Sequence, residues 1–99
     1  YSSKKDYDNT KDEDLIEIIK SGDKYALDYL IDRYKELVNI KVSKYYIIGA
    51  ERDDIVQEGL IGLFKAIKCY KPDQQNSFKS FANMYIERQL ITAIKNICR

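Results

Sequence analysis

The half of the chain from residue 54 to residue 99 constrains the fold most strongly, because it contains two helical patterns separated by one short polar break. Apolar residues recur at helical spacing over residues 55–70. Pro72 ends this pattern, since proline disfavours helix at the residue before it. A second helical pattern begins at Phe78. We therefore expect two amphipathic helices here, with the rest of the chain arranged around them.

The start of the chain predicts one short helix after an irregular end. Residues 1–9 are polar without any period, and we expect this segment to be frayed. Thr10 and Glu13 have the spacing of a capping box, in which each side chain bonds the other's backbone. A helix is predicted from about residue 11 to residue 20. Gly22 then suits the C-cap that ends it.

The longest predicted helix follows, from about residue 24 to residue 46, with Asp23 as its N-cap. Its apolar stripe is broad enough to form the spine of a helical bundle. The next break is predicted at residues 48–50. Asp53 is the expected N-cap of the third helix, and Asp54 suits its first turn by the helix dipole.

Gly59 and Gly62 lie inside the third predicted helix, where each costs up to ~1 kcal/mol relative to Ala. With no sign of a kink, these glycines predict the close approach of another helix. Asn76 or Ser77 is expected to cap the last helix. No stretch alternates as a strand does. The predicted fold class is therefore all-α, with four helices joined by short connections.

The composition excludes several classes of function. Ninety-nine residues suit a single domain, and no apolar run approaches the ~20 residues that span a membrane. There is no histidine, which excludes a histidine-containing metal site and a nucleophile–histidine pair. Cys69 and Cys98 lack metal-site spacing and are expected to be partly buried, reduced thiols of a cytoplasmic protein. We expect neither a cofactor nor an enzymatic activity.

The charges are distributed unevenly along the last two predicted helices. Residues 51–58 carry four acids and one base, whereas residues 77–99 carry four bases and one acid. Lysine and arginine side chains neutralise phosphates, and aromatic rings stack on unpaired nucleobases. The spacing alone leaves two interpretations open. Phe81 and Tyr85 either belong to the core, with the bases solvating the outer face, or they face a nucleic acid.

The third predicted helix raises the same question. Asp54, Gln57 and Glu58 form its polar side, and Leu60 and Phe64 lie at the edge of that side. Apolar residues beside carboxylates suit docking onto an arginine-rich partner helix. The alternative is that both apolar side chains pack inside the domain.

Two long runs of residues resemble a known family. DDIVQEGLIGLFKAI and SFKSFANMYIERQLITAIK are similar to region 2 of the bacterial sigma-70 family of transcription initiation factors, and the similarity extends over about residues 14–99. Within the family, the runs YYIIGAERDDIVQEG and ERQLITAIK look most like the sigma-H group of sporulation and transition-state factors. The resemblance implies a fragment of a longer factor, whose regions 3 and 4 lie outside this chain.

The resemblance also implies partners and residue roles. The expected partners are core RNA polymerase and promoter DNA, above all the non-template strand of the −10 element. Five positions match those that contact the polymerase β′ clamp helices: Asp54, Gln57, Glu58, Leu60 and Phe64. Seven positions match those that contact DNA, or lie beside them on the same helix: Phe81, Met84, Tyr85, Arg88, Ile91, Thr92 and Lys95.

Particular positions refine this expectation. Phe81 matches the aromatic that stacks on a flipped-out adenine of the −10 element. Arg88 and Ile91 match the two residues that contact its upstream base pair, where primary factors have Gln and Thr. Met84 stands where primary factors have Trp, and Asn76 where they commonly have another aromatic. These departures imply an alternative factor with weaker melting and a different −10 preference.

Two other hypotheses remain open from the sequence. The chain could be a protein-only interaction module whose partner is, for example, an anti-sigma factor. It could also be a conventional regulator that inserts its last helix into the major groove of duplex DNA. The regulator hypothesis predicts tight, specific duplex binding without polymerase, and the module hypothesis predicts weak DNA contact.

Overall fold

A computed structural model describes residues 7–45, 51–71 and 76–97. Within these residues, four helices follow one another: α2 (Asp12–Lys20), α3 (Lys24–Tyr45), α4 (Arg52–Cys69) and α5 (Phe78–Ile97). The described residues contain no strand, so the all-α prediction is confirmed. The predicted break at residues 48–50 lies outside the described residues, as do residues 73–75 of the polar break predicted at residues 73–76.

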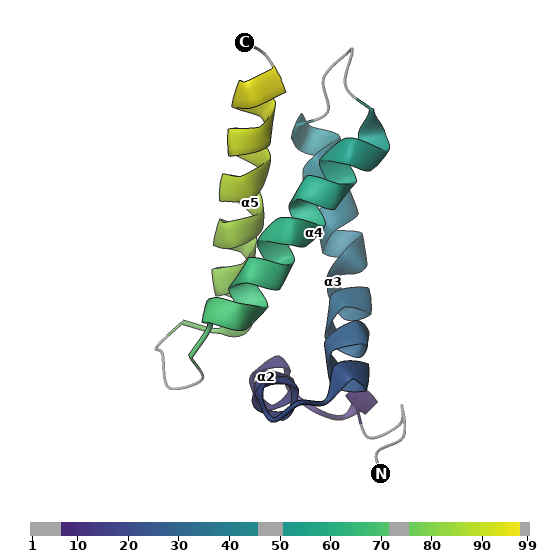
Figure 1. The fold of residues 1–99 in the computed structure, drawn as a ribbon, viewed down its shortest axis with the longest axis vertical. Coiled ribbons are helices and arrows are strands. Elements are labelled where there is room, and N and C mark those ends of the chain that lie inside the picture. Colours follow the sequence, from purple (N-terminus) through teal and green to yellow (C-terminus); the bar gives the residue numbers. More distant parts are fainter. Residues whose placement is uncertain (1–6, 46–50, 72–75, 98–99) are drawn as a thin grey trace.

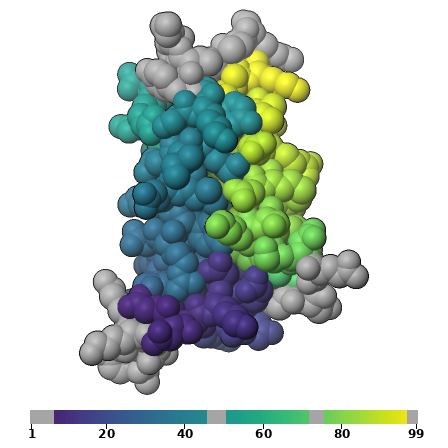
Figure 2. Space-filling view, turned by 180° about the vertical axis from the view of Figure 1, so that it is seen from behind, coloured from purple at the N-terminus to yellow at the C-terminus, as the bar shows by residue number. Residues whose placement is uncertain are grey.

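The three long helices run up, down and up, and α2 crosses one end of the bundle (Figure 1). From behind, α3 and α5 lie side by side and the purple N-terminal part of the chain covers their lower ends (Figure 2). Every helix contributes to one apolar core. Its largest fully buried side chains include Leu15, Ile16, Leu30, Val38, Ile55, Leu63, Tyr70, Phe78, Ile86 and Leu90.

The two glycines of α4 lie where its neighbours come closest, as the sequence predicts. A Cβ atom on Gly62 would lie 2.9 Å from the backbone oxygen of Tyr85 and 3.0 Å from the Cα atom of Ile86 on α5. A Cβ atom on Gly59 would lie 2.7 Å from Cγ1 of Val38 on α3. Glycine therefore allows α4 to pack against both long helices at once.

The connection between α2 and α3 forms as predicted. Gly22 has a φ of 112° and donates its N–H to the Ile19 carbonyl at 2.9 Å, in the geometry that ends many helices. Asp23 caps α3, because its Oδ1 accepts from the backbone N–H groups of Tyr25 at 2.9 Å and Ala26 at 3.1 Å. The turn thus supplies both caps within two residues.

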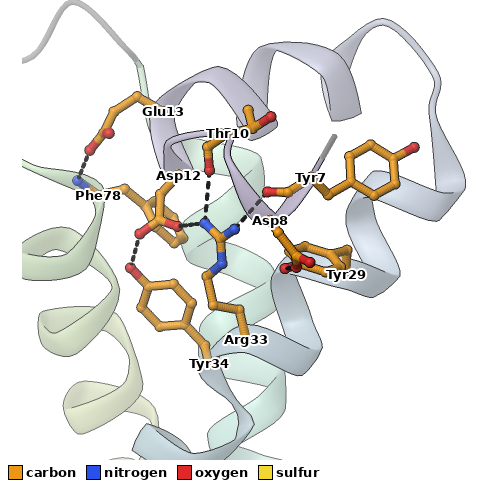
Figure 3. Close-up of polar contacts among 9 residues, drawn as sticks. All are labelled: Tyr7, Asp8, Thr10, Asp12, Glu13, Tyr29, Arg33, Tyr34 and Phe78. Carbon is orange, nitrogen blue, oxygen red and sulfur yellow. Dashed lines mark hydrogen bonds and ion pairs between the residues drawn. The ribbon is translucent and has the colours of Figure 1, made fainter. Parts of the chain in front are cut away.

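Two other predicted caps are wrong. The N-cap of α2 is Lys11, without a side-chain cap bond, so Thr10 and Glu13 form no capping box. Glu13 accepts instead from the backbone N–H of Phe78 at 2.8 Å, because α2 lies across the start of α5, where backbone N–H groups lack helical partners (Figure 3). Helix α4 begins after Glu51, and Asp53 lies in its first turn rather than at the cap.

Ser77 caps α5, which confirms one of the two predicted alternatives. Its Oγ accepts from the backbone N–H of Ser80 at 3.2 Å, and its carbonyl accepts from Phe81 at 3.1 Å. Together with Glu13, this side chain satisfies two backbone donors at the start of α5.

Arg33 holds the polar end of the bundle together (Figure 3). Its guanidinium donates to the carbonyl oxygens of Tyr7 at 2.8 Å and Thr10 at 3.0 Å, and to the Asp12 carboxylate at 2.7 Å. The hydroxyl of Tyr34 donates to the same carboxylate. Tyr7 belongs to the segment that we expected to be frayed, but only 4% of its surface is exposed.

No described helix is long and apolar enough to cross a membrane.

Candidate functional site

A row of aromatic rings runs from the end of α4 along α5. The ring of Tyr70 packs edge-on against Phe81 at a centroid distance of 5.3 Å, and Phe81 packs against Tyr85 at 4.9 Å. The Arg88 guanidinium lies 5.9 Å from the Tyr85 ring centre. Phe81 and Tyr85 are half-buried and pack against the core, so the core interpretation is confirmed in part, whereas contact with a nucleic acid stays a prediction. Each ring is supported from inside and retains an accessible side.

The remaining DNA-contact predictions lie on the outer surface of α5. Met84 and Ile91 are exposed to 45% and 37%. Three polar or basic residues are exposed with them: Arg88, Thr92 and Lys95. The helix therefore presents basic side chains, a hydroxyl group and apolar side chains to solvent along several turns.

The polar residues predicted on α4 lie in a groove between the start of α4 and the end of α5. Asp54 and Gln57 are exposed and Glu58 is half-buried. The groove has a volume of about 370 Å³, and Asp54, Gln57, Glu58, Gln89, Thr92 and Asn96 supply its polar lining. One predicted DNA-contact residue, Thr92, thus shares a groove with three predicted polymerase-contact residues.

Leu60 and Phe64 lie farther along α4. Leu60 is half-buried against the core, as the packing alternative predicted, whereas Phe64 is exposed to 40%. Phe64 lines a separate, largely apolar hollow with Ile19, Leu27 and Ile67. The ammonium of Lys68 lies 5.4 Å from the Phe64 ring centre. Of the five residues predicted on α4, three therefore line the polar groove, Phe64 lines the apolar hollow, and Leu60 lines neither.

Gln89 is the side chain that the sequence-based selection of residues missed. Its Nε2 donates to the Glu58 carboxylate at 2.8 Å, and its Oε1 accepts from the Lys65 ammonium at 3.2 Å. The signal was present in the sequence, since Gln89 precedes Thr92 by three residues and therefore lies on the same side of the helix. Helical spacing alone gave no indication of its two partners on α4.

Two ionisable groups on α5 have shifted pKa values. A hydrogen bond with Cys69 raises the pKa of the Tyr85 hydroxyl above its ordinary value. A hydrogen bond from Lys41 at 2.7 Å lowers the pKa of the Glu87 carboxyl.

Cys69 is exposed, contrary to the expectation of partial burial, because it lies on the outer side of the last turn of α4. Cys98 lies outside the described residues.

Neither the polar groove nor the apolar hollow resembles a metal centre. No three acidic or cysteine side chains come together as ligands anywhere in the part of the chain that the structure describes. What the two surfaces offer instead is a combination of charge, hydrogen-bonding groups and exposed apolar area, which suits binding to macromolecules.

Comparison with known families gives one match over most of the bundle. The family described as Sigma-70 region 2 matches residues 30–97, which include all of α4 and α5. This match contains every residue that the sequence resemblance singled out.

Individual relatives agree with this match. The chain is 50% identical to the RNA polymerase sigma-H factor of Bacillus subtilis (strain 168) and to that of Bacillus licheniformis, over 98% of its length and 44% of theirs. It is 37% identical over 88% of its length to the RNA polymerase sigma factor SigI of Bacillus subtilis, of which it covers 35%. The expected likeness to the sigma-H group is confirmed. The chain spans less than half the length of these relatives.

Proposed function

Because this chain belongs to the Sigma-70 region 2 family, we propose that it serves as the polymerase-binding and promoter-melting part of a sporulation-type transcription initiation factor. The proposal rests mainly on the outer surface of α5. There, exposed basic and apolar side chains extend a row of half-buried aromatic rings. The protein would act in the cytoplasm, together with core RNA polymerase.

In this proposal, the acidic start of α4 docks on the clamp helices of the polymerase β′ subunit. Asp54 and Gln57 are exposed and lie beside Glu58 in one groove, so a basic partner side chain would meet two carboxylates and an amide together. Exposed Phe64 would add apolar contact farther along the same helix. Such a combination of a charged rim and an apolar anchor is typical of protein–protein interfaces.

The aromatic row would capture unpaired bases of the non-template strand. Flipping a base out of the stack costs a few kcal/mol, and stacking on an aromatic ring returns ~1–3 kcal/mol per base. Phe81 packs against both Tyr70 and Tyr85, so its ring is already oriented before DNA arrives. Binding then loses little side-chain entropy.

Arg88 and Ile91 would contact the upstream edge of the −10 element while it is still duplex. The position of Arg88 over the Tyr85 ring restricts its guanidinium, which favours a defined contact with a phosphate or a guanine edge. Exposed Met84 would contact the upstream end of the bubble less firmly than an aromatic ring. No chemical step is involved, because trapping of single-stranded bases keeps the bubble open.

Titration with a peptide fragment containing the β′ clamp helices tests the first half of the proposal. Wild-type chain should bind saturably, and Gln57→Ala and Glu58→Lys should weaken binding. Glu36→Lys makes the matched control, since it reverses the same charge at an exposed site on α3. If a folded wild-type chain fails to bind, or if Glu36→Lys weakens binding equally, the polymerase assignment is wrong.

The second half of the proposal is tested with the chain bound to core polymerase and a single-stranded non-template −10 oligonucleotide. Phe81→Ala should lower the affinity by at least tenfold, since it removes one base-stacking ring. Tyr25→Ala removes a ring that is 79% exposed on α3 and serves as the control. Tight, specific binding to duplex DNA without polymerase would favour a conventional regulator instead.

A further inference from the structure

A single side chain of α5 connects the two proposed surfaces. Gln89 follows Arg88 directly, and both ends of its amide are bonded to α4. The Nε2 atom donates to Oε1 of Glu58 at 2.8 Å, and Oε1 accepts from Nζ of Lys65 at 3.2 Å. Because an amide has one accepting end and one donating end, these two bonds together fix which way it points.

The sequence of α4 places both partners and the space for this amide on one face. Glu58, Gly62 and Lys65 have the i, i+4, i+7 spacing of a single helix face. A Cβ atom on Gly62 would lie 3.0 Å from Cβ of Gln89, so a larger residue there would push the amide away. The absence of a side chain at Gly62 thus leaves room for the hydrogen-bonded Gln89 amide and also allows the two helices to pack closely.

We propose that Gln89 is a positioning residue for polymerase binding, which holds the Glu58 carboxylate in the groove in the orientation that the clamp helices meet. This inference rests on the proposed function. Glu58 is half-buried and lies between exposed Gln57 and the α5 surface, where a free glutamate would sample several rotamers. A carboxylate that is already oriented loses less conformational entropy when a partner binds.

Gln89 lies where the two proposed surfaces meet on α5. Thr92, one turn beyond Gln89, lines the same groove, and Arg88 precedes Gln89 on the proposed DNA side. A side chain of the DNA-facing helix therefore orients a residue that faces the polymerase.

A double-mutant cycle tests the inference, with calorimetric titration of the 99-residue chain against the β′ clamp-helix peptide. Gln89→Met keeps the length of the side chain but removes both bonds. It should weaken binding roughly fivefold, the scale expected for coupled neighbours. In the Glu58→Ala background the same change should alter the affinity less than twofold, because no carboxylate remains to be positioned.

A second variant and a spectroscopic signature separate positioning from a merely structural role. Gln89→Glu keeps the acceptor for Lys65 but places a carboxylate against Glu58, so it should weaken binding at least as much as Gln89→Met. In NMR spectra, the side-chain amide resonances of Gln89 should shift in Glu58→Ala. Lys79→Met changes an exposed position of α5 that does not line the groove and should leave the affinity within twofold.

The outcomes distinguish the two proposals. Equal weakening by Gln89→Met with and without Glu58 would overturn the positioning role while polymerase binding stands, as would wild-type affinity in both Gln89 variants. Absence of binding by the folded wild-type chain would overturn the proposed function, and the positioning role with it.

Discussion

The start and the middle of α5 are held in place by different physical means. At its start, side chains from α2 and the preceding loop bond its backbone, and Arg33 ties the neighbouring segments together through polar contacts. Along its middle, α5 packs against α4 so closely that a Cβ atom on Gly62 would approach the Tyr85 backbone to 2.9 Å. Hydrogen bonds to its backbone distinguish the first region, and close backbone packing distinguishes the second.

This difference suggests where the molecule tolerates change. Lost hydrogen bonds in a partly exposed network are in part replaced by water, so each costs about 1 kcal/mol. A steric overlap between two backbones has no such substitute, because both helices must move. The proposed binding residues lie on the outer sides of the sterically fixed pair, which suits surfaces that require a defined geometry.

The strongest test of the comparison is Gly62→Ala. We expect a loss of about 2–3 kcal/mol in the free energy of unfolding, since overpacking outweighs the ~1 kcal/mol that alanine contributes to helix propensity. Chemical denaturation followed by circular dichroism measures this. Ile61→Ala, next to it at a 42% exposed site, should remain within about 0.5 kcal/mol of wild type. Equal stability of wild type and Gly62→Ala would contradict the close approach.

Gly59→Ala should have a smaller effect, because the nearest atom is a side-chain methyl group of Val38, at 2.7 Å, rather than backbone. We expect a loss of about 1–2 kcal/mol. If the clash with Val38 is the cause, Gly59→Ala should be less damaging in a Val38→Ala background, although Val38→Ala alone is destabilising. Denaturation of the four proteins gives the coupling energy, and strict additivity would count against this contact.

Much of this architecture follows from local sequence. The helical spacing of apolar residues predicted the bounds of α2 and α3, and Gly22 and Asp23 predicted the turn between them, because caps depend on neighbouring residues. The glycines of α4 predicted a close helix contact, since a helix interior otherwise disfavours them.

Contacts between distant segments were less accessible to sequence reasoning. Glu13 was assigned to its own helix but bonds Phe78, which lies 65 residues away in the chain. The hydrogen bonds of Gln89 could not be predicted either, because its two partners lie on another helix. A long polar side chain reaches many alternatives, and the tertiary packing decides among them. The half-buried state of Phe81 likewise depends on Tyr70, which the helical spacing of α5 does not reveal.

Arg33→Met tests the polar region. The substitution keeps much of the aliphatic stem but removes the bonds to Tyr7, Thr10 and Asp12, and we expect a loss of about 1–2 kcal/mol. Arg52→Met is the matched control. Within the part of the chain that the structure describes, the contacts of Arg52 are exposed ones of 3.3 Å and 3.5 Å, so the substitution should cost less than about 0.5 kcal/mol. A loss for Arg33→Met as large as that for Gly62→Ala, measured by the same denaturation, would remove the distinction between the two regions.

The smallest expected effect concerns an ion pair that joins α3 to α5 and depends on pH. Lys41 lowers the pKa of Glu87 below its ordinary value of 4.5, so the pair stabilises the fold above that pH. The contribution is lost as the pH falls through the lowered pKa of the folded state. Because Glu87 is 44% exposed, we expect only on the order of 0.5 kcal/mol. In denaturation at pH 7 and pH 3, Glu87→Gln should reduce stability at pH 7 alone, and in a Lys41→Met background this difference should vanish. If Glu87→Gln is also less stable than wild type at pH 3, Glu87 stabilises the fold by packing rather than by charge. This part of α5 would then be held by close packing, as it is at Gly62.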